Sequence, residues 1–97
     1  MMKRTTPASG ITKVTFAIPI DQTTGGVSVV GEFNGWDPSA HPLRARSNRT
    51  RSVTLELPAH GCYEFKYLAD DGTWFCEPEA ERSVVNEYGQ LNSVVTT

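Results

Sequence analysis

The stretch CYEFKYLADDGTWFC, residues 62–76, has the composition of a β-hairpin. Two runs rich in aromatic residues, 62–69 and 73–76, flank the turn sequence DDG at 70–72. This turn suits a three-residue loop in which the two aspartates form a type I turn and the glycine adopts the left-handed conformation. We therefore expect two antiparallel strands whose register is set by this loop.

The loop places Leu68 opposite Trp74, and residues directly opposite each other share one face of a sheet. One face therefore carries two charged residues among its members, which are Glu64, Lys66, Leu68, Trp74 and Cys76. The other face is aromatic and uncharged, so we expect it in the core: Tyr63, Phe65, Tyr67 and Phe75. Because lysine is almost never fully buried without a partner, we expect the face of Lys66, and Trp74 with it, to meet solvent.

Turn signals recur along the rest of the chain and predict many short strands. The expected strands cover 11–18, 27–33, 43–46, 51–57, 62–69, 73–76 and 91–96, and the expected loops cover 21–26, 37–42, 47–50, 58–61 and 77–87. No window longer than a turn has the period of about 3.6 residues that marks a helix. Six or seven strands without a helix predict an all-β fold, an antiparallel sandwich.

Length and composition indicate one small domain. The 97 residues fit a single domain, for which we expect 11–97, with 1–10 as a flexible N-terminal tail. The net charge of -2 argues against a general binder of nucleic acid or of acidic membranes. No apolar run reaches membrane-spanning length, and the N-terminus lacks the apolar region of a signal peptide. We therefore expect a cytoplasmic protein.

The two cysteines, Cys62 and Cys76, are fewer than a disulfide-stapled secreted fold usually has. In the expected hairpin they lie about four rungs apart, at about 3.3 Å per residue, which is beyond disulfide reach. We expect both thiols to be free. His41 and His60 have no partners at metal-ligand spacing, so we expect neither a metal nor a cofactor.

A tryptophan stands in a turn within VVGEFNGWDP, residues 29–38. The pair Asn34-Gly35 is a turn signal that ends the preceding apolar run. Trp36 then either folds back as a plug at the end of the sandwich or is displayed for a ligand. The residues around it leave both interpretations open.

Three stretches occur together: GEFNGWDP at 31–38, LPAHGCYEFKYLADDGTWFCEP at 57–78 and NEYGQLNSVV at 86–95. They resemble the early-set domains of carbohydrate-binding module family 48. These include the N-terminal domains of isoamylases and glycogen-branching enzymes, and the glycogen-binding domain of AMP-activated kinase β subunits. The resemblance is nearest to small bacterial proteins in which this domain stands alone. It implies an immunoglobulin-like β-sandwich that binds α-1,4-glucan and has its catalysis in a separate barrel domain.

The resemblance also implies the residues of a glucan-binding site, namely Trp36, Lys66, Trp74, Tyr88, Gln90 and Asn92. Four of them are the residue types that the glycogen-binding members use, whereas Tyr88 and Gln90 stand where kinase-type domains have a leucine and a threonine. The turn before Trp74 is one residue longer than the usual VDG of the family. The three-residue loop keeps Trp74 on the face of Lys66 despite this insertion.

These residue types suit a sugar polymer. An indole offers a flat, electron-rich face to the C–H face of a glucose ring, and lysine and asparagine offer hydrogen bonds to its hydroxyls. Stacking that removes about 80 Å² of apolar surface contributes roughly 2 kcal/mol per tryptophan. Since association itself costs several kcal/mol, we expect a dissociation constant of about 10 µM to 1 mM.

The same residues leave two other classes of function to consider. A protein-interaction module that packs against a glycoside hydrolase family 13 enzyme, without sugar binding, is the alternative. A glycan-metabolising enzyme or another protein is in either case a candidate partner in trans. An enzyme is disfavoured, because a glycosidase holds two carboxylates at a defined separation across a cleft. The arginines at 44, 46, 49 and 51 are interpreted as a charged, solvated sheet edge.

Overall fold

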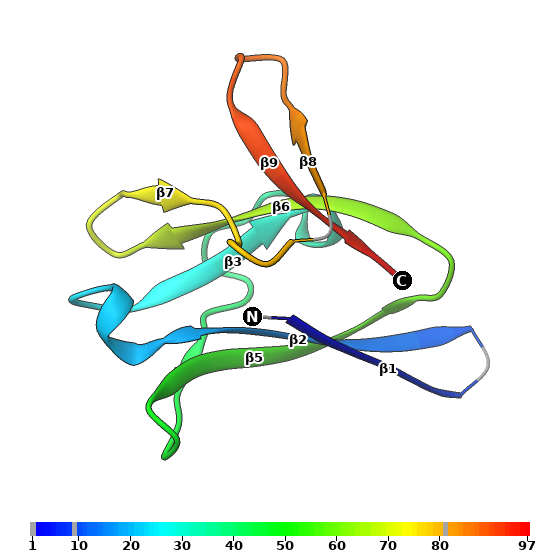
Figure 1. Cartoon of the computed structure of the whole chain (residues 1–97), viewed down its shortest axis with the longest axis horizontal. Coiled ribbons are helices and arrows are strands. Elements are labelled where there is room, and N and C mark those ends of the chain that lie inside the picture. The colour runs from blue at the N-terminus through cyan, green and yellow to red at the C-terminus, as the bar shows by residue number, and fades with distance from the viewer. Residues whose placement is uncertain (1, 9, 81) are drawn as a thin grey trace.

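Two antiparallel sheets stack face to face in the computed structural model, which describes residues 2–8, 10–80 and 82–97 (Figure 1). The first sheet has the order β1-β2-β5-β4, and the second has the order β3-β6-β9-β8, with β7 added beside β6. The strands are β1 Met2–Ala8, β2 Ile11–Pro19, β3 Val27–Gly31, β4 Arg44–Ala45, β5 Thr50–Pro58, β6 Cys62–Ala69, β7 Trp74–Phe75, β8 Arg82–Val85 and β9 Leu91–Thr96. The architecture is the all-β, immunoglobulin-like sandwich that the sequence predicted.

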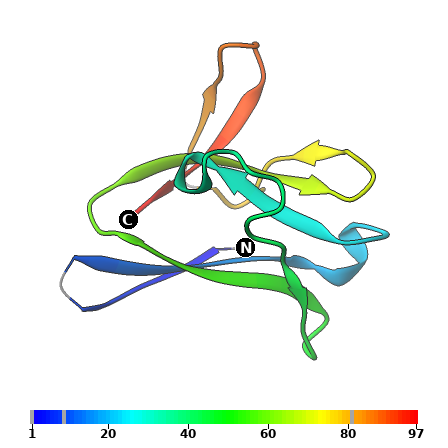
Figure 2. The same ribbon diagram turned by 180° about the vertical axis from the view of Figure 1, so that it is seen from behind.

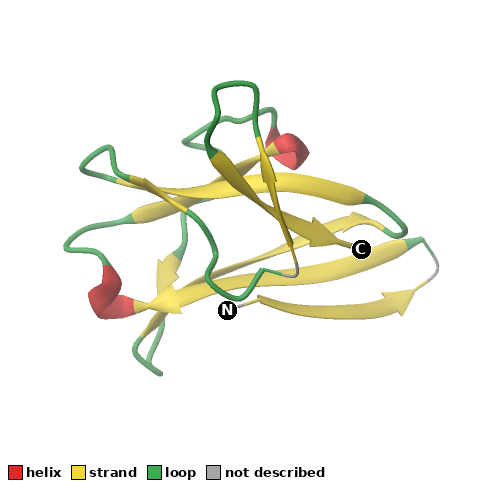
Figure 3. Cartoon of the chain, turned by 45° about the horizontal axis from the view of Figure 1, so that its top comes forward, coloured by secondary structure: helices red, strands yellow, loops and turns green. Residues whose placement is uncertain are grey.

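Two short 3-10 segments, η1 Ile20–Gln22 and η2 Glu32–Asn34, are the helical pieces of the described chain (Figure 3). None of the helices in the described part of the chain is long and apolar enough to cross a membrane. The η2 segment continues β3 and lies against β6 (Figure 2). The strand expected over 27–33 therefore ends at Gly31, and the chain coils before the turn that carries Trp36.

The core lies between the sheets and is built from alternating residues of both. On β2, Phe16 is fully buried, and its ring packs edge-on against Phe65 of β6, with 4.9 Å between ring centroids. The cluster comprises Val14, Phe16, Ile18, Val27, Val29, Leu43, Leu55, Leu57, Phe65, Tyr67 and Val95. Burying one such side chain stabilises the fold by about 1.5–3 kcal/mol.

The hairpin of β6 and β7 has the predicted register. Leu68 pairs with Trp74, and Tyr67 pairs with Phe75. The backbone N–H of Ala69 donates to the carbonyl of Thr73 at 2.9 Å, which closes the three-residue loop. Gly72 takes the left-handed conformation with φ +90°, as that loop requires. The aromatic face is therefore in the core, and the face of Lys66 looks away from it.

Two strands lie where the sequence predicted none. Residues 2–8, expected as part of a flexible tail, form β1 and pair with β2. Residues 82–85, expected as loop, form β8 and pair with β9. Both are edge strands, which form by backbone pairing with a neighbour and need little apolar alternation of their own. Their residues therefore carried too weak a pattern to be recognised.

A buried carboxylate anchors the segment that leaves β7. Glu77 is 3% exposed, and its Oε1 accepts a hydrogen bond from the Tyr67 hydroxyl at 2.8 Å. The backbone N–H of Glu77 donates to Ser93 Oγ at 2.9 Å. Burial, and next the negative charge of Glu77, raise the pKa of Tyr67 above that of an ordinary tyrosine. The chain after β7 is thus tied to β6 and β9.

Cys62 and Cys76 are both free thiols.

Candidate functional site

A shallow hollow of about 730 Å³ lies on the face of the β3-β6-β9-β8 sheet that looks away from the core. Its lining comes from four places: η2 with the turn after it, β6, β7, and the β8–β9 hairpin, which projects from the sandwich (Figure 1). The lining residues are Glu32, Trp36, Glu64, Lys66, Trp74, Val85, Asn86, Glu87, Tyr88, Gln90 and Asn92. All six residues singled out from the sequence therefore meet in one hollow.

Trp36 is displayed in an unusual backbone conformation. Its φ is +61°, in the left-handed region that costs a bulky residue about 1–2 kcal/mol. The side chain is 39% exposed, so it is no buried plug. Its turn is held by the backbone N–H of Trp36, which donates to the carbonyl of Gly31 at 2.9 Å, and by the side chain of Asn34. Asn34 accepts from the N–H of Gly31 and donates to the carbonyl of Val29.

The turn that carries Trp36 comes close to β6 because the residue before η2 is a glycine. A Cβ at Gly31 would lie 2.6 Å from the backbone oxygen of Glu64, closer than real Cβ atoms approach. Behind the turn, the N–H and the hydroxyl of Ser39 donate to Asp37 Oδ1 at 2.9 and 2.8 Å. The backbone N–H of Ser39, and next its hydroxyl, hold the pKa of Asp37 below the usual range.

Trp74 supplies the second exposed indole, and it is 46% exposed. It comes from β7 and lies directly opposite Leu68, on the face that also carries Lys66. Lys66 is half-buried in the middle of β6, where it pairs with Val30 of β3. The two tryptophans thus reach the hollow from different elements, one from the η2 turn and one from the sheet.

A chain of hydrogen bonds joins the sheet to the turn of the β8–β9 hairpin. Asn92 Nδ2 donates to Glu64 Oε1 at 3.1 Å, and Asn92 Oδ1 accepts from Asn86 Nδ2 at 3.3 Å. Asn86 Oδ1 in turn accepts the backbone N–H groups of Tyr88 at 2.9 Å and Gln90 at 3.1 Å. Asn92 is only 4% exposed. It therefore lies at the base of the hollow with part of its hydrogen-bonding capacity already engaged.

Tyr88 and Gln90 sit on the turn that this chain of hydrogen bonds supports. Tyr88 is 80% exposed, the most exposed large apolar side chain of the described residues. Gln90 is also exposed, and its backbone carbonyl accepts a hydrogen bond from the backbone N–H of Asn86 at 2.7 Å. Both side chains are therefore presented at the rim of the hollow, whereas Asn92 is recessed.

Sequence reasoning missed the remaining lining residues. The sequence placed Glu64 on the correct face of β6 but not among the site residues. In the structure its backbone N–H donates to Glu32 Oε1 at 2.7 Å. Asn86 and Glu87 lay in a segment expected as loop. The signal available for Asn86 was the sequence NEYGQ, in which an asparagine and a glycine bracket a turn. Glu32 carried no signal, because its contact with β6 spans 32 residues of chain.

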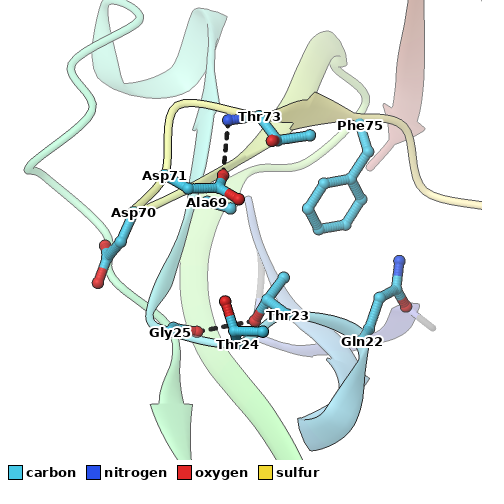
Figure 4. A pocket seen from close by; sticks show the side chains of 9 residues that line it. All are labelled: Gln22, Thr23, Thr24, Gly25, Ala69, Asp70, Asp71, Thr73 and Phe75. Atoms are coloured by element: carbon cyan, nitrogen blue, oxygen red, sulfur yellow. Dashed lines mark hydrogen bonds between the residues drawn. The ribbon is translucent and has the colours of Figure 1, made fainter.

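A second hollow, of about 580 Å³, lies between the loop after η1 and the β6–β7 turn (Figure 4). Its polar side chains are used to hold these two loops. Asp71 Oδ1 accepts the N–H of Thr73 at 2.9 Å, and Asp70 Oδ2 accepts the N–H of Gly26 at 3.0 Å. Phe75, which borders this hollow, packs against the core. In the ranges 2–8, 10–80 and 82–97, no group of three or more His, Cys, Asp or Glu residues could hold a metal ion.

Comparison with known proteins gives one family and several relatives. The sequence model of the family described as "Glycogen recognition site of AMP-activated protein kinase" matches residues 14–97. A 1,4-alpha-glucan branching enzyme of Burkholderia lata is 48% identical over 50 residues, which is 47% of this chain and 6% of the enzyme. The branching enzyme of Paramagnetospirillum magneticum is 36% identical over 66 residues, 65% of this chain and 9% of the enzyme. That of Xanthomonas campestris pv. campestris is 40% identical over 47 residues.

The chain thus spans less than a tenth of the length of these branching enzymes. The matched family covers most of the chain, including every residue that lines the first hollow. The resemblance to carbohydrate-binding module family 48, inferred from three sequence stretches, is confirmed by both comparisons.

Proposed function

Because the chain belongs to the family of the glycogen recognition site of AMP-activated protein kinase, we propose that it binds α-1,4-glucan in the first hollow, without catalysing a reaction on it. Glucan binding is the property of the family; the roles of single residues are our proposal. Trp36 and Trp74 stack on glucose rings. Lys66, Gln90 and Asn92 hydrogen-bond hydroxyl groups, and Tyr88 covers the bound chain from the hairpin.

The observation that carries this proposal is the meeting of two exposed indoles at one hollow. The chain has two tryptophans in all, and both line it. Indole faces match the C–H faces of pyranose rings. The strained backbone of Trp36 supports the same conclusion, since such strain is found mostly at functional sites. Because the two indoles project from a turn and from a strand, they suit a curved α-1,4-linked chain.

Asn92 requires a more specific role than the sequence suggested. It is nearly buried, and it donates to Glu64 and accepts from Asn86. Its amide retains one N–H and one lone pair for a ligand, because an asparagine side chain has two donors and two acceptor sites. We infer that Asn92 both contacts a sugar that enters deeply and positions the turn that carries Tyr88 and Gln90.

A second candidate function is a contact with another protein. Val85 is 68% exposed and Leu91 is 53% exposed, and they are direct cross-strand neighbours on the β8–β9 hairpin. An exposed apolar pair on a projecting hairpin suits a protein partner, such as a glucan-modifying enzyme, and this contact would not require the module to bind sugar itself. We further propose that the protein acts in the cytoplasm, because thiols such as Cys62 and Cys76 stay reduced there.

Affinity electrophoresis through gels that contain glycogen, amylopectin or cellulose tests the main proposal. We expect retardation by the two α-glucans and none by cellulose. The β-linked chain of cellulose is flat, so it cannot stack on both indoles when these project from different elements. No retardation by any polysaccharide, together with no binding of maltoheptaose in solution, would exclude sugar binding and leave the protein-contact function.

A further inference from the structure

The hollow that holds the two tryptophans has an acidic lining. Glu32, Glu64 and Glu87 contribute three carboxylates, and Lys66 contributes one ammonium group. No other charged side chain lines it among the described residues. Since glutamate is ionised and lysine is protonated at neutral pH, the lining carries a net charge of -2. A neutral sugar needs no such surplus of negative charge.

Two of these carboxylates are held in place by hydrogen bonds from the sheet. Glu32 Oε1 accepts the backbone N–H of Glu64 at 2.7 Å, and Glu64 Oε1 accepts from Asn92 Nδ2 at 3.1 Å. Glu64 is therefore fixed on β6 beside the recessed Asn92, and the exposed Glu32 is held on the side of Trp36. Glu87 stands on the exposed turn at the rim. Negative charge thus faces a ligand from the base and from the rim.

Carboxylates accept hydrogen bonds and donate none. A sugar hydroxyl can donate to them, so a neutral glucan is well matched to this lining. A phosphate monoester carries a charge of about -1.5 to -2 at neutral pH and offers mainly acceptors. It is repelled by like charge and finds no donors among the three glutamates. The same lining therefore separates two classes of α-glucan that share one backbone.

Resting on the proposed function, we propose that the hollow accepts neutral stretches of α-1,4-glucan and rejects stretches that carry phosphate monoesters. Lys66 does not reverse this preference. It is on the same face of β6 as Glu64, and the three glutamates outnumber it in the lining. The arginines at 44, 46, 49 and 51 lie outside the hollow and offer phosphate a separate place to bind.

Tryptophan fluorescence separates these two places, because both tryptophans of the chain line the hollow. The full chain is titrated with maltoheptaose, and with maltoheptaose that carries one phosphate monoester on O6 of an inner glucose. Titrations are run at low and at high salt. The readout is the ratio of the two dissociation constants, which is insensitive to any general weakening of the site.

We expect the phosphorylated sugar to bind about tenfold more weakly at low salt, with a gap that narrows at high salt because ions screen the repulsion. The triple variant Glu32→Gln, Glu64→Gln, Glu87→Gln keeps one acceptor oxygen in each side chain and removes the negative charges, so that Lys66 is the one charged residue left in the described part of the lining and the ratio should fall to one or below. Glu56→Gln, an exposed carboxylate on β5 of the other sheet, makes the same kind of charge change and should leave the ratio as it is.

Equal affinities in the wild-type protein would overturn the inference and leave the proposed function standing. A gap that persists in a triple variant with normal melting would also overturn it, since the discrimination would then be steric. If the triple variant melts early, the salt dependence of the wild-type ratio decides instead. A gap in affinity that narrows at high salt supports repulsion by charge, and a gap that salt does not change would mean that the discrimination is steric, which overturns the inference. If maltoheptaose itself does not change the fluorescence and does not bind by calorimetry, the proposed function fails, and the inference fails with it.

Discussion

Replacing Trp74 by alanine should weaken the binding of maltoheptaose by about thirtyfold. Trp74 is 46% exposed, and a tryptophan has up to about 250 Å² of surface to bury. Roughly half of that surface is then open to a ligand, and a stacked glucose ring covers about 80 Å² of it. At about 25 cal/mol/Å² this contributes roughly 2 kcal/mol, which is about thirtyfold in the dissociation constant.

The same change should cost little stability. Trp74 projects from a two-residue strand on the face away from the core, so we expect a loss of about 1–2 kcal/mol from packing on the sheet surface. Phe65 is fully buried on the opposite face, so Phe65→Ala should lose about 3–5 kcal/mol by leaving a cavity. The two substitutions thus separate binding from folding.

Maltoheptaose titration by calorimetry and thermal unfolding should be measured on the same preparations. Leu68→Ala is the matched control, because Leu68 lies directly opposite Trp74 but does not line the hollow. It should bind within about threefold of the wild type, a difference of less than 1 kcal/mol. If Trp74→Ala bound maltoheptaose as well as Leu68→Ala does, the stacking role would be refuted. If it melted as early as Phe65→Ala, the assignment of the two faces would be wrong.

Three further outcomes are expected. Trp36→Gly should be about 0.5–1 kcal/mol more stable than Trp36→Ala in urea unfolding, because only glycine takes a φ of +61° without strain, and both variants should bind maltoheptaose equally poorly. Asn86→Ala should weaken maltoheptaose binding about five- to tenfold with a small change in melting, because it frees the N–H groups of Tyr88 and Gln90; Asn86→Asp keeps the acceptor and should bind better than Asn86→Ala. The raised pKa of Tyr67 keeps its hydroxyl protonated in the folded state above pH 10, where an unfolded tyrosine ionises; stability should therefore fall as pH rises above 10, and Tyr67→Phe should lack that part of the fall in unfolding experiments between pH 9 and about 11.

Local sequence determined the hairpin of β6 and β7, because its register depends on a turn and on residues that follow one another in the chain. The alternation of aromatic and polar side chains then determined which face is buried. The exposed position of Trp74 followed from these two facts, and Lys66 shares its face for the same reason. Trp36, Tyr88, Gln90 and Asn92 could be placed only through the resemblance to a family.

Tertiary structure alone decided how these pieces meet. The edge strands β1 and β8 form because β2 and β9 present unpaired backbone N–H and C=O groups to them. The residues of β1 and β8 themselves carry no clear strand pattern. The contact of Glu32 with the backbone of Glu64, and the burial of Asn92 between Glu64 and Asn86, join segments that are distant in the chain. Periodicity and turn propensity describe only neighbours along the sequence. The acidic lining of the hollow is therefore a product of the fold, since it forms only when η2, β6 and the β8–β9 hairpin come together.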